Sequence, residues 1–493
     1  MKNAIELTQS LRISQIVTGL WQVADMERET GELDPQKTAE EMIPYIKAGI
    51  SSFDMADHYG SSEVIAGALK GFQLKQPAQL FTKWVPKPGK ITKATVKKAV
   101  ERSLKRMKQD SIDLMQYHTW NYLDPSWIDA LIYLKELKEE GYIKNIGVTN
   151  FDPQHLRIAC ASGIPIITNQ ISYSLLDRRG SDEQMKNVCK KYDVKLLAYG
   201  SLAGGFLTDK WLGKKEPEKE GLATWSEMKY KRFIDISGGW DVYQNLLKVI
   251  KQIANAHNVS IANISTKYCL QNPFVAAVII GARLGKSEHL KDNFRMLKLK
   301  IPDEDLDKIN NAQNKLSTIP GNCGDEYRKP PYLTASGDLS HHVDKLPNVF
   351  KLKENIKGIS TVSSNTKWEK MASYSRALKF QNRVLVSGTT ATHGQILVGR
   401  QDATAQTHFI LDKIEASIES LGGTLKDVIR TRIFIKNISD WERIAAVHGE
   451  RFKGINPVNT MVKAGLIGEG YLVEIEAEAS IKNTKPNERI TKK

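Results

Sequence analysis

The stretch SSFDMADHYGSSEVIAGALKG, residues 51–71, decides how the first part of this chain folds. It begins with a short apolar run, 51–56, typical of a buried β-strand, and Asp54 and Tyr59 stand at or just past the end of that run. The pattern returns in QLFTKW (79–84), which carries Lys83, and in DLMQYH (113–118), which ends on His118. Polar side chains at the ends of three successive strands indicate one site at the rim of a parallel sheet.

Strand-like and helix-like segments alternate over the first 310 residues. The predicted strands are 14–21, 51–56, 79–84, 112–118, 143–149, 166–172, 195–200 and 276–281, and the predicted helices include 37–47, 93–108, 129–140, 182–192 and 242–255. Eight strands, each followed by a helix, predict an α/β fold, the (β/α)8 TIM barrel. An open doubly wound sheet is the alternative, but it favours a glycine-rich turn after the first strand, and no GxGxxG follows Trp21.

Length and composition limit the class of protein. At 493 residues the chain exceeds what one core normally supports, so we expect two domains. A hydrophobic fraction of 41% is typical of a soluble globular protein, and no apolar run approaches the roughly 20 residues that span a bilayer. The N-terminus lacks a secretory signal and the four cysteines lack metal-ligand spacing, so we expect reduced thiols and a cytoplasmic location. The net charge of +15 comes from scattered lysines, which favours a solvated surface over a nucleic-acid partner.

A second domain follows a change of composition. The segment IPGNCGDEYRKPPYLTASGDLSHH, 319–342, is rich in Gly, Pro and polar residues and predicts the end of the barrel and a connector. Beyond it, strand-like runs at 373–380, 384–391, 396–399, 428–435, 460–467 and 471–481 and helices at 403–421 and 440–452 predict an α+β domain with a mixed sheet. We expect a barrel over 1–335, a linker over 336–345, the α+β domain over 346–483 and a flexible tail over 484–493.

The four polar side chains of the first domain have the chemistry needed to protonate a carbonyl oxygen. A tyrosine with a pKa of about 10 is a poor acid at neutral pH, so we expect the ammonium of Lys83 to lower the pKa of Tyr59. Asp54 would hold Lys83 through an ion pair, and His118 would donate a hydrogen bond to the substrate oxygen. Singly, each residue has a structural alternative, such as a turn aspartate or a core histidine. Together on three successive strands, they favour the catalytic interpretation.

The first domain resembles the aldo-keto reductases over roughly residues 10–335. FDMADHYGSSEVIAGALKG is similar to the aspartate–tyrosine signature of that family, with Asp54 and Tyr59 at the matching places. FTKW supplies the matching lysine, Lys83, and QYHTW the matching histidine, His118. The resemblance implies a (β/α)8 barrel and NADPH-dependent carbonyl reduction without a metal, in which Tyr59 is the general acid.

The resemblance also implies where the reacting end of the cofactor binds. In GVTNF and NQISYS it places Thr149, Asn150 and Gln170 at the nicotinamide carboxamide. In LLAYGSLAGGFL it places the Tyr199 ring against the nicotinamide. The residues that would contact the pyrophosphate, chiefly through their backbone, are Gly200, Ser201 and Leu202. Here Gly200 and Ser201 replace the serine and proline that are commoner in the family.

The adenosine end of the cofactor is assigned to the segment VIIGARLGKSEHLKDNF, 278–294. Gly281 ends a strand, Arg283 and Ser287 would meet the adenosine 2′-phosphate, and Asp292 and Asn293 would face the adenine. A guanidinium is well suited to a phosphate, so NADPH is preferred to NADH. The spacing between Gly281 and Asn293 is longer than in many members of the family.

Two further features bear on the substrate. Trp21, Trp84 and Trp120 lie at or just past strand ends beside the catalytic residues. If they line the pocket rather than pack within the barrel, they favour an apolar or aromatic aldehyde or ketone. The long polar stretch 208–240 predicts a lid over the cofactor, with a disordered insertion as the alternative.

The second domain offers little catalytic chemistry by itself, and it resembles the RidA (YjgF) family, which has a chorismate-mutase-like fold. SYSRALKFQNRVLVSGTTA (373–391), GGTLKDVIRTRIFIKN (422–437) and NPVNTMV…YLVEIEAEA (456–479) carry the resemblance. It implies trimers with ligand clefts between subunits and, in active members, hydrolysis of enamines and imines. Tyr374, Ser387 and Glu474 stand at matching positions, but Asn459 stands where the family has its substrate-carboxylate arginine.

The sequence therefore predicts an NADPH-dependent reductase of a small-molecule aldehyde or ketone, fused to a RidA-like domain that forms a homotrimer or binds a small ligand. No nucleic-acid or membrane partner is expected. Two alternatives stay open. One is a barrel that holds NADPH as a redox sensor. The other is a bifunctional enzyme whose second domain hydrolyses imines. The carbonyl compound itself is not specified, because specificity lies in loops.

Overall fold

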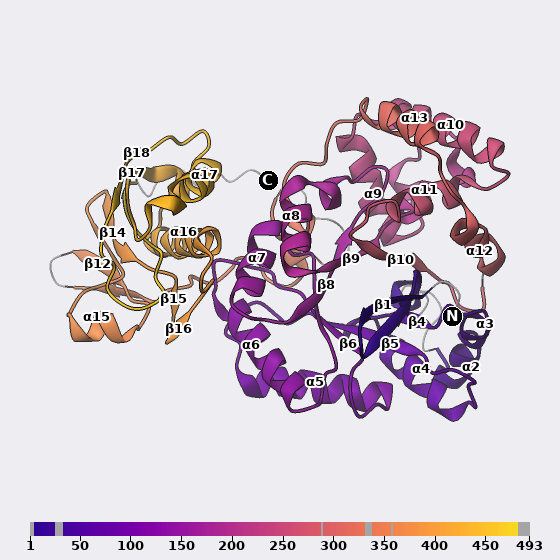
Figure 1. The fold of residues 1–493 in the computed structure, drawn as a ribbon, viewed down its shortest axis with the longest axis horizontal. Helices are drawn as coiled ribbons and strands as arrows, with labels where there is room; N and C mark the ends of the chain where they lie inside the picture. The colour runs from indigo at the N-terminus through magenta and orange to yellow at the C-terminus, as the bar shows by residue number, and fades with distance from the viewer. Residues whose placement is uncertain (1–3, 25–32, 287–288, 331–337, 356–357, 482–493) are drawn as a thin grey trace. The chain divides into compact units, whose positions relative to one another are not determined.

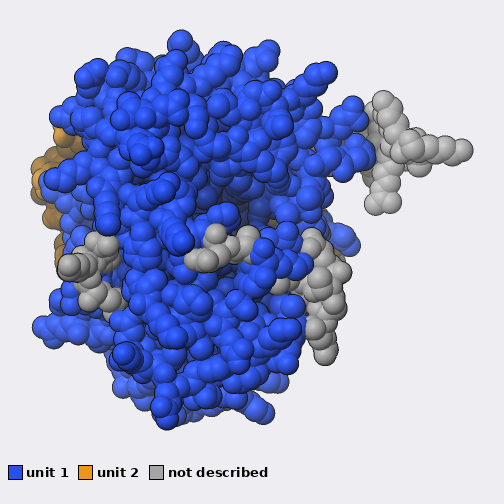
Figure 2. Space-filling model, turned by 90° about the vertical axis from the view of Figure 1, so that its right-hand side faces the viewer, with its two compact units in different colours: residues 1–120, 129–153, 165–344 blue, residues 121–128, 154–164, 345–493 orange. Residues whose placement is uncertain are grey.

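The structure, a computed structural model, describes residues 4–24, 33–286, 289–330, 338–355 and 358–481. The predicted tail, 484–493, and the first two residues of the predicted linker lie outside this range. The chain divides into two compact units, 1–120, 129–153 and 165–344 in the first and 121–128, 154–164 and 345–493 in the second; Figure 2 shows the first in blue. Among the described residues, no helix is long and apolar enough to cross a membrane.

The first unit is built on eight parallel strands that close into a barrel, as the sequence predicts (Figure 1). In chain order the strands are β3 Ile16–Gly19, β4 Ser52–Asp54, β5 Gln79–Trp84, β6 Leu114–Tyr117, β7 Ile146–Thr149, β8 Ile166–Ser172, β9 Lys195–Tyr199 and β10 Val275–Gly281. Each strand pairs with the next, and β10 closes the ring on β3, where Gly281 lies opposite Gly19. Nearly every residue of these strands is buried, as a sheet covered on both faces requires, although β4, β5, β6 and β8 carry polar side chains.

An N-terminal hairpin that the sequence did not predict precedes the barrel. Strands β1 Ala4–Thr8 and β2 Leu11–Ser14 pair antiparallel. Leu11 and Ile13 are buried in one cluster with Phe81, Leu114 and other barrel residues. Because β2 leads directly into β3, this apolar cluster lies at the amino ends of the barrel strands. The carboxyl ends are therefore the side on which polar chemistry can be presented.

The helices alternate with the strands along the chain. They are α2 Pro35–Glu40, α3 Ile43–Lys47, α4 Ser62–Ala68, α5 Lys93–Met107, α6 Ser126–Glu139, α7 Pro153–Ala161, α8 Glu183–Tyr192, α9 Trp225–Ile236, α10 Trp240–Ala256, α11 Ile261–Cys269, α12 Leu290–Lys298, α13 Asp303–Gln313 and α14 Asp325–Arg328. The helix predicted over 37–47 is instead two short helices, with Pro44 at the start of the second, where its missing N–H is tolerated. Helix α5 shows the usual signals: Thr92 caps its first turn, and Lys108 ends it in the left-handed conformation.

The stretch 208–240 is a folded part of the barrel unit, which corrects the alternative of a disordered insertion. It contains two short 3-10 turns, Asp209–Trp211 and Lys219–Gly221, and the whole of helix α9. Lys229, Tyr230, Phe233 and Ile234 of α9 are buried. The stretch is polar on average, but helix α9 has an apolar face because its apolar side chains recur at helical spacing.

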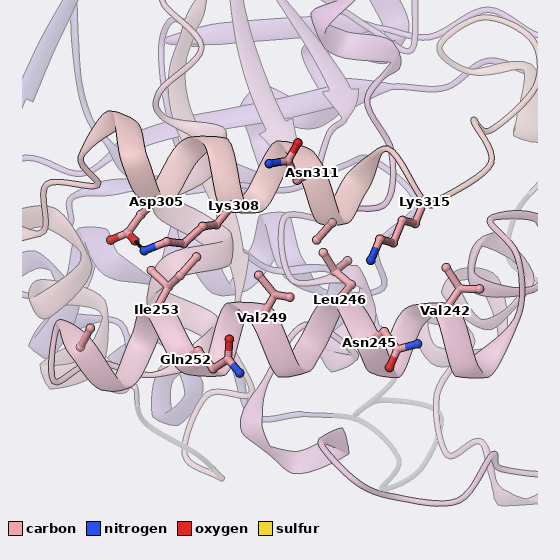
Figure 3. A pocket seen from close by; sticks show the side chains of 12 residues that line it. Val242, Asn245, Leu246, Val249, Gln252, Ile253, Asp305, Lys308, Asn311 and Lys315 are labelled. Atoms are coloured by element: carbon pink, nitrogen blue, oxygen red, sulfur yellow. Dashed lines mark hydrogen bonds and ion pairs between the residues drawn. The ribbon is translucent and has the colours of Figure 1, made fainter.

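A surface groove lies between two outer helices of the barrel unit, α10 and α13 (Figure 3). Its cavity has a volume of about 480 Å³. Figure 3 shows Val242, Leu246, Val249 and Ile253 of α10 facing α13, with Lys308 beside Asp305 at one end. The lining is apolar with a polar edge, and the groove contains none of the predicted catalytic residues.

The second unit holds a seven-stranded sheet in the order β11-β12-β13-β14-β19-β17-β18. Its elements are β11 Leu352–Glu354, β12 Ile359–Val362, α15 Lys367–Met371, β13 Ala377–Phe380, β14 Arg383–Thr389, β15 Thr392–His393, β16 Ile396–Leu397, α16 Ala403–Ser420, β17 Val428–Ile435, α17 Trp441–Arg451, β18 Val458–Lys463 and β19 Val473–Ser480. Only β17 and β18 pair in parallel, so the sheet is mixed, as predicted. The strand predicted at 396–399 lies outside this sheet, in a two-stranded hairpin of β15 and β16.

Candidate active site

A buried ion pair lies at the centre of the barrel. Lys83 on β5 places its Nζ 2.6 Å from Oδ2 of Asp54 on β4, and the two residues are 3% and 4% exposed. The other carboxylate oxygen, Oδ1, accepts hydrogen bonds from Nε2 of Gln116 at 2.9 Å and of Gln170 at 2.7 Å. Both oxygens of this buried carboxylate are therefore hydrogen-bonded, as a buried polar group requires.

The phenol of Tyr59 lies above this pair. The Nζ of Lys83 is 4.9 Å from the centroid of the Tyr59 ring, and Trp21 meets the same ring edge-on at 4.7 Å. Burial raises the pKa of Tyr59 well above its ordinary value, and the carboxylate of Asp54 raises it further. This corrects the expectation that Lys83 lowers that pKa, because desolvation of the phenolate outweighs the attraction of one ammonium. Tyr59 therefore carries its proton at neutral pH, as a proton donor must.

The imidazole of His118, just past β6, is buried and uncharged. Burial lowers its pKa to about 3, and the charge of Arg328 contributes. Its Nδ1 lies 3.3 Å from the carbonyl oxygen of Thr149, and because that oxygen only accepts, the proton sits on Nδ1. Nε2 has no hydrogen-bond partner among the described residues and presents a lone pair. His118 is thus an acceptor at Nε2, which corrects the expectation of a donor.

Thr149, Asn150 and Tyr199 meet at the rim, as the sequence predicts for the reacting end of the cofactor. Asn150 follows β7 in the left-handed conformation, with φ 59°, and its Oδ1 accepts a hydrogen bond from the Tyr199 hydroxyl at 2.7 Å. Among the described buried atoms, Oγ1 of Thr149 and Oγ of Ser201 have no hydrogen-bond partner. Buried hydroxyls elsewhere in the described part of this unit, such as those of Thr168 and Ser172, also have no such partner, so those of Thr149 and Ser201 matter for their place at the rim. Gln170, the third residue predicted at the carboxamide, already has protein partners: its amide nitrogen donates to Asp54 and to Oε1 of Gln116 at 3.0 Å.

Helix α9 covers the loop that follows β9, which sequence reasoning treated only as backbone. Gly200 has φ +67°, and a Cβ placed there would meet the Tyr230 hydroxyl at 1.9 Å. Burial raises the pKa of Tyr230 to about 12, so this phenol is neutral. Trp225, at the start of α9, has its ring 5.9 Å from that of Trp21. The stretch 208–240, predicted as a lid, therefore reaches the aromatic residues around Tyr59. Leu202, also in this loop, is half-buried.

The connector segment contributes residues that the sequence did not single out. Arg328 is buried and its Nη2 donates to the carbonyl oxygens of Asn150 at 2.8 Å and Cys323 at 3.0 Å. The ring of Tyr327 is 6.0 Å from that of His118, and its hydroxyl lies 3.3 Å from that of Tyr199. The mixed Gly, Pro and polar composition of this segment does not indicate that Tyr327 and Arg328 lie at the rim. The one available signal is that the segment follows the last barrel helix, from which the chain can return to the rim.

The predicted adenosine site is described in part. Gly281 is the last residue of β10, and Arg283 stands two residues after it. The carboxylate of Asp292 accepts hydrogen bonds from Oγ of Ser260 at 3.0 Å and from Asn263, so it is engaged with α11. Asn293 is half-buried in the first turn of α12, where its backbone N–H bonds to His289. Ser287 lies outside the described residues.

The three predicted pocket tryptophans differ in what they expose. Trp84 and Trp120 each retain 4% exposure, so neither ring offers much surface to a substrate. Trp84 packs against Tyr117 at 5.5 Å, and Nε1 of Trp120 donates to the carbonyl oxygen of Pro86 at 2.7 Å. Trp21, in contact with Tyr59, is half-buried. Barrel packing explains Trp84, and the prediction of an aromatic pocket rests mainly on Trp21.

The second unit has its own cleft, with a volume of about 560 Å³. Tyr374 and Ser387 line it together with Arg430, Arg432 and Glu476. Two other predicted residues do not line it. Asn459 donates from Nδ2 to Oγ1 of Thr431 at 2.9 Å, and Glu474 lies on β19 against Gly388 of the neighbouring strand, where a Cβ would meet its carboxylate.

Comparison with known proteins agrees with both units. Residues 15–314 match the family model described as Aldo/keto reductase family, and residues 365–481 match the model described as Endoribonuclease L-PSP. The NADH-specific methylglyoxal reductase of Escherichia coli (strain K12) is 26% identical over 326 residues, covering 60% of this chain and 94% of that protein. The glycerol dehydrogenase of Gluconobacter oxydans shares the fold, with 23% identity, coverage of 65% and 98%, and a TM-score of 0.52.

A Mycobacterium tuberculosis member of the YjgF/YER057c/UK114 family is 40% identical and covers 25% of this chain and 99% of its own, with a TM-score of 0.23. The two family models, over residues 15–314 and 365–481, decide the assignment of this chain. The chain therefore belongs to the aldo/keto reductase family of oxidoreductases and carries a RidA-like domain at its C-terminal end.

Proposed function

We propose that the barrel catalyses the NADPH-dependent reduction of an aldehyde or ketone to an alcohol. The observation that carries the proposal is the Asp54–Lys83 ion pair, buried at 2.6 Å beneath the Tyr59 ring. Burying two charges costs several kcal/mol per ion, and apolar residues of the same volume would stabilise a barrel as well. A buried ammonium under a phenol is better explained by a proton transfer that leaves negative charge on that phenol.

In this mechanism Tyr59 donates its proton to the carbonyl oxygen. The ammonium of Lys83 stabilises the phenolate that remains, and Asp54 keeps Lys83 protonated and in place. Burial lowers the pKa of Lys83 while Asp54 raises it, so the carboxylate is what preserves the charge. The reduced nicotinamide, when bound, supplies the hydride to the carbonyl carbon.

His118 orients the oxygen from the other side. Its Nδ1 proton bonds to Thr149, so its Nε2 lone pair faces the reacting oxygen and accepts a hydrogen bond once that oxygen has become a hydroxyl. With a pKa of about 3, its imidazole stays neutral throughout. The role of His118 is then to favour the alcohol product and fix its orientation.

A nicotinamide dinucleotide fits the residues that surround Tyr59. The unpartnered hydroxyls of Thr149 and Ser201 and the half-buried ring of Tyr199 supply donors and a stacking face at the carboxyl ends of β7 and β9. Arg283, next to β10, supports a phosphorylated cofactor. Because one relative is named as NADH-specific, both dinucleotides belong in the assay.

For the RidA-like domain we propose assembly or binding of a small ligand. The cleft beside Tyr374 and Ser387 has room for a metabolite, and it is lined by two arginine–glutamate pairs, Arg430 with Glu478 and Arg432 with Glu476. Imine hydrolysis is the weaker candidate, because Asn459 bonds to Thr431 and does not line the cleft. The four cysteines are free thiols, which supports a cytoplasmic setting for the whole chain.

A panel of aldehydes and ketones with NADPH or NADH, followed at the absorbance of the cofactor, tests the proposal. Steady-state turnover with at least one carbonyl compound is expected. One slow turnover followed by no further reaction would favour a redox sensor instead. Ammonia release from an enamine substrate would support the imine-hydrolysing alternative, and light scattering of the full chain would show whether it is a trimer.

A further inference from the structure

Helix α9 buries a lysine that the mechanism above does not use. Lys229 is 4% exposed, and its ammonium lies over the faces of several aromatic rings. The centroids of these rings are 4.3 to 5.6 Å from Nζ and belong to Tyr327, Tyr199, Tyr230 and Phe233. Cation–π contacts of this kind offset part of the cost of taking an ammonium out of water.

The polar partners of Lys229 are a phenol hydroxyl and a more distant carboxylate. Its Nζ donates to the Tyr327 hydroxyl at 2.6 Å and lies 3.8 Å from Oε1 of Glu326. The other oxygen of Glu326 accepts a closer bond from Arg179, at 2.9 Å. Burial raises the pKa of Glu326, but Arg179 and Lys229 together lower it below its ordinary value. Arg179 also pairs with Asp177 at 2.7 Å, so two carboxylates face two cations, and Lys229 is the cation whose charge lies over the Tyr199 ring.

The position of this charge relative to the Tyr199 ring matters. Nζ of Lys229 is 5.0 Å from the centroid of that ring. Lys229 is buried, whereas Tyr199 is half-buried at the carboxyl end of β9. Because a buried ammonium covers one face of this ring, the part of the ring that stays accessible is left for a ligand.

We propose that Lys229 makes the Tyr199 ring selective for a reduced, uncharged nicotinamide over an oxidised, cationic one. The inference rests on the proposed function, in which the nicotinamide stacks on Tyr199. A reduced nicotinamide stacked on Tyr199 is uncharged, so the ammonium of Lys229 does not repel it. An oxidised nicotinamide in the same place carries a positive charge roughly 8 Å from that ammonium. At an effective dielectric constant of about 20, with Glu326 offsetting part of the field, the discrimination amounts to about tenfold in affinity.

The test compares dissociation constants rather than turnover. Fluorescence titration of the full chain gives them for NADPH, NADP⁺, NADH and NAD⁺. Lys229→Met keeps the length and apolar contacts of the side chain and removes the charge. We expect it to raise the affinity for the oxidised form relative to the reduced form about tenfold. Lys229→Arg, which keeps the charge, should preserve the ratio of the unmodified protein.

A matched control lies two residues further along the same helix. Lys231 pairs with Glu216 at 2.6 Å and with Asp235 at 2.5 Å. Within the described residues, Lys231 does not contact Tyr199. Lys231→Met should leave the ratio of oxidised to reduced affinity unchanged. If Lys229→Met binds both forms with the original ratio, the inference is wrong while the proposed function stands. If the unmodified chain binds no dinucleotide, both are wrong.

A second variant covers the case in which Lys229→Met does not fold. Glu326→Gln removes the carboxylate that offsets Lys229, so it should shift the ratio in the opposite direction and weaken the oxidised form several-fold. Circular dichroism checks that each variant is folded. An unchanged ratio in a folded Glu326→Gln variant would equally overturn the inference.

Discussion

The Tyr230 hydroxyl occupies the place into which a side chain at position 200 would project, 1.9 Å from the Cβ that Gly200 lacks. The glycine therefore admits helix α9 against the loop after β9. We expect Gly200→Ser to lower the melting temperature of the barrel by about 5 °C or more, because the serine forces Tyr230 aside and strains a backbone with φ +67°.

The control for this variant is in the same loop. Gly205 has φ +97°, but nothing lies within 4 Å of a Cβ placed there. Gly205→Ser thus carries the backbone strain without the clash, and we expect it to cost only about 1 kcal/mol. Equal destabilisation by the two variants, measured by calorimetry, would argue against the contact between Gly200 and Tyr230.

Tyr59→Phe removes the proposed proton donor and keeps its ring. We expect turnover to fall by about 10³-fold or more, while the dissociation constant of the cofactor changes little. Tyr243→Phe is the matched control. That phenol is buried on α10 and bonds to the carbonyl oxygen of Phe206 at 2.6 Å, so its loss affects stability rather than chemistry. Full activity of Tyr59→Phe would refute the assignment.

Asp54→Asn tests the ion pair through pH. Without the carboxylate, burial is no longer opposed and the pKa of Lys83 falls further. We expect kcat to drop about 10²-fold and its alkaline limb to move to lower pH, because Lys83 then loses its proton earlier. Asp113→Asn is the control. It breaks another ion pair, with Lys144 at 2.7 Å, which lies just before β6 and so at the end of that strand opposite His118. This variant should leave the alkaline limb in place. A limb that does not move in Asp54→Asn would exclude Lys83 as its source.

His118 predicts a pH dependence of stability rather than of rate. Its pKa is about 3 in the folded chain against 6.5 ordinarily, so between these values the unfolded chain binds the extra proton. Stability should therefore rise with pH from 3 to 6.5, and His118→Asn should reduce that slope by up to one proton. Urea midpoints at several pH values measure it. A kcat profile with an acid limb near pH 6.5 that disappears in this variant would contradict the neutral imidazole.

Lys413 makes the corresponding prediction for the second unit. Burial lowers its pKa to about 7, and its Nζ donates to the carbonyl oxygen of Thr392 at 2.7 Å. Between pH 7 and 10.5 the unfolded chain binds more protons, so the stability of this unit should rise with pH over that window. We expect Lys413→Met to remove that rise, as seen in the urea transition of the second unit at pH 7 and pH 9. A slope that persists in the variant would show that other groups cause it.

Local sequence determined the barrel strands and the residues that end them. Each strand is a short buried run: Asp54 ends β4, Lys83 is the penultimate residue of β5, and His118 directly follows β6. Chain order then places them at one rim, because parallel strands present all their carboxyl ends together. The resemblance added Thr149, Asn150 and Tyr199, which the structure brings together. The small hairpin of β1 and β2 escaped notice because its strands have only five and four residues, too few for a clear alternation.

Tertiary structure alone decided the surroundings of these residues. Tyr327 follows Tyr199 by 128 residues, and Lys229 precedes Tyr327 by 98, so no motif records that the three meet. Burial, which depends on all neighbours at once, made the phenol of Tyr59 a weaker acid and His118 an acceptor, against what residue types alone suggested. The sequence could name the groups that transfer a proton, since that depends on side-chain chemistry. Their protonation states, and the charge behind Tyr199, depend on how much water the closed barrel excludes.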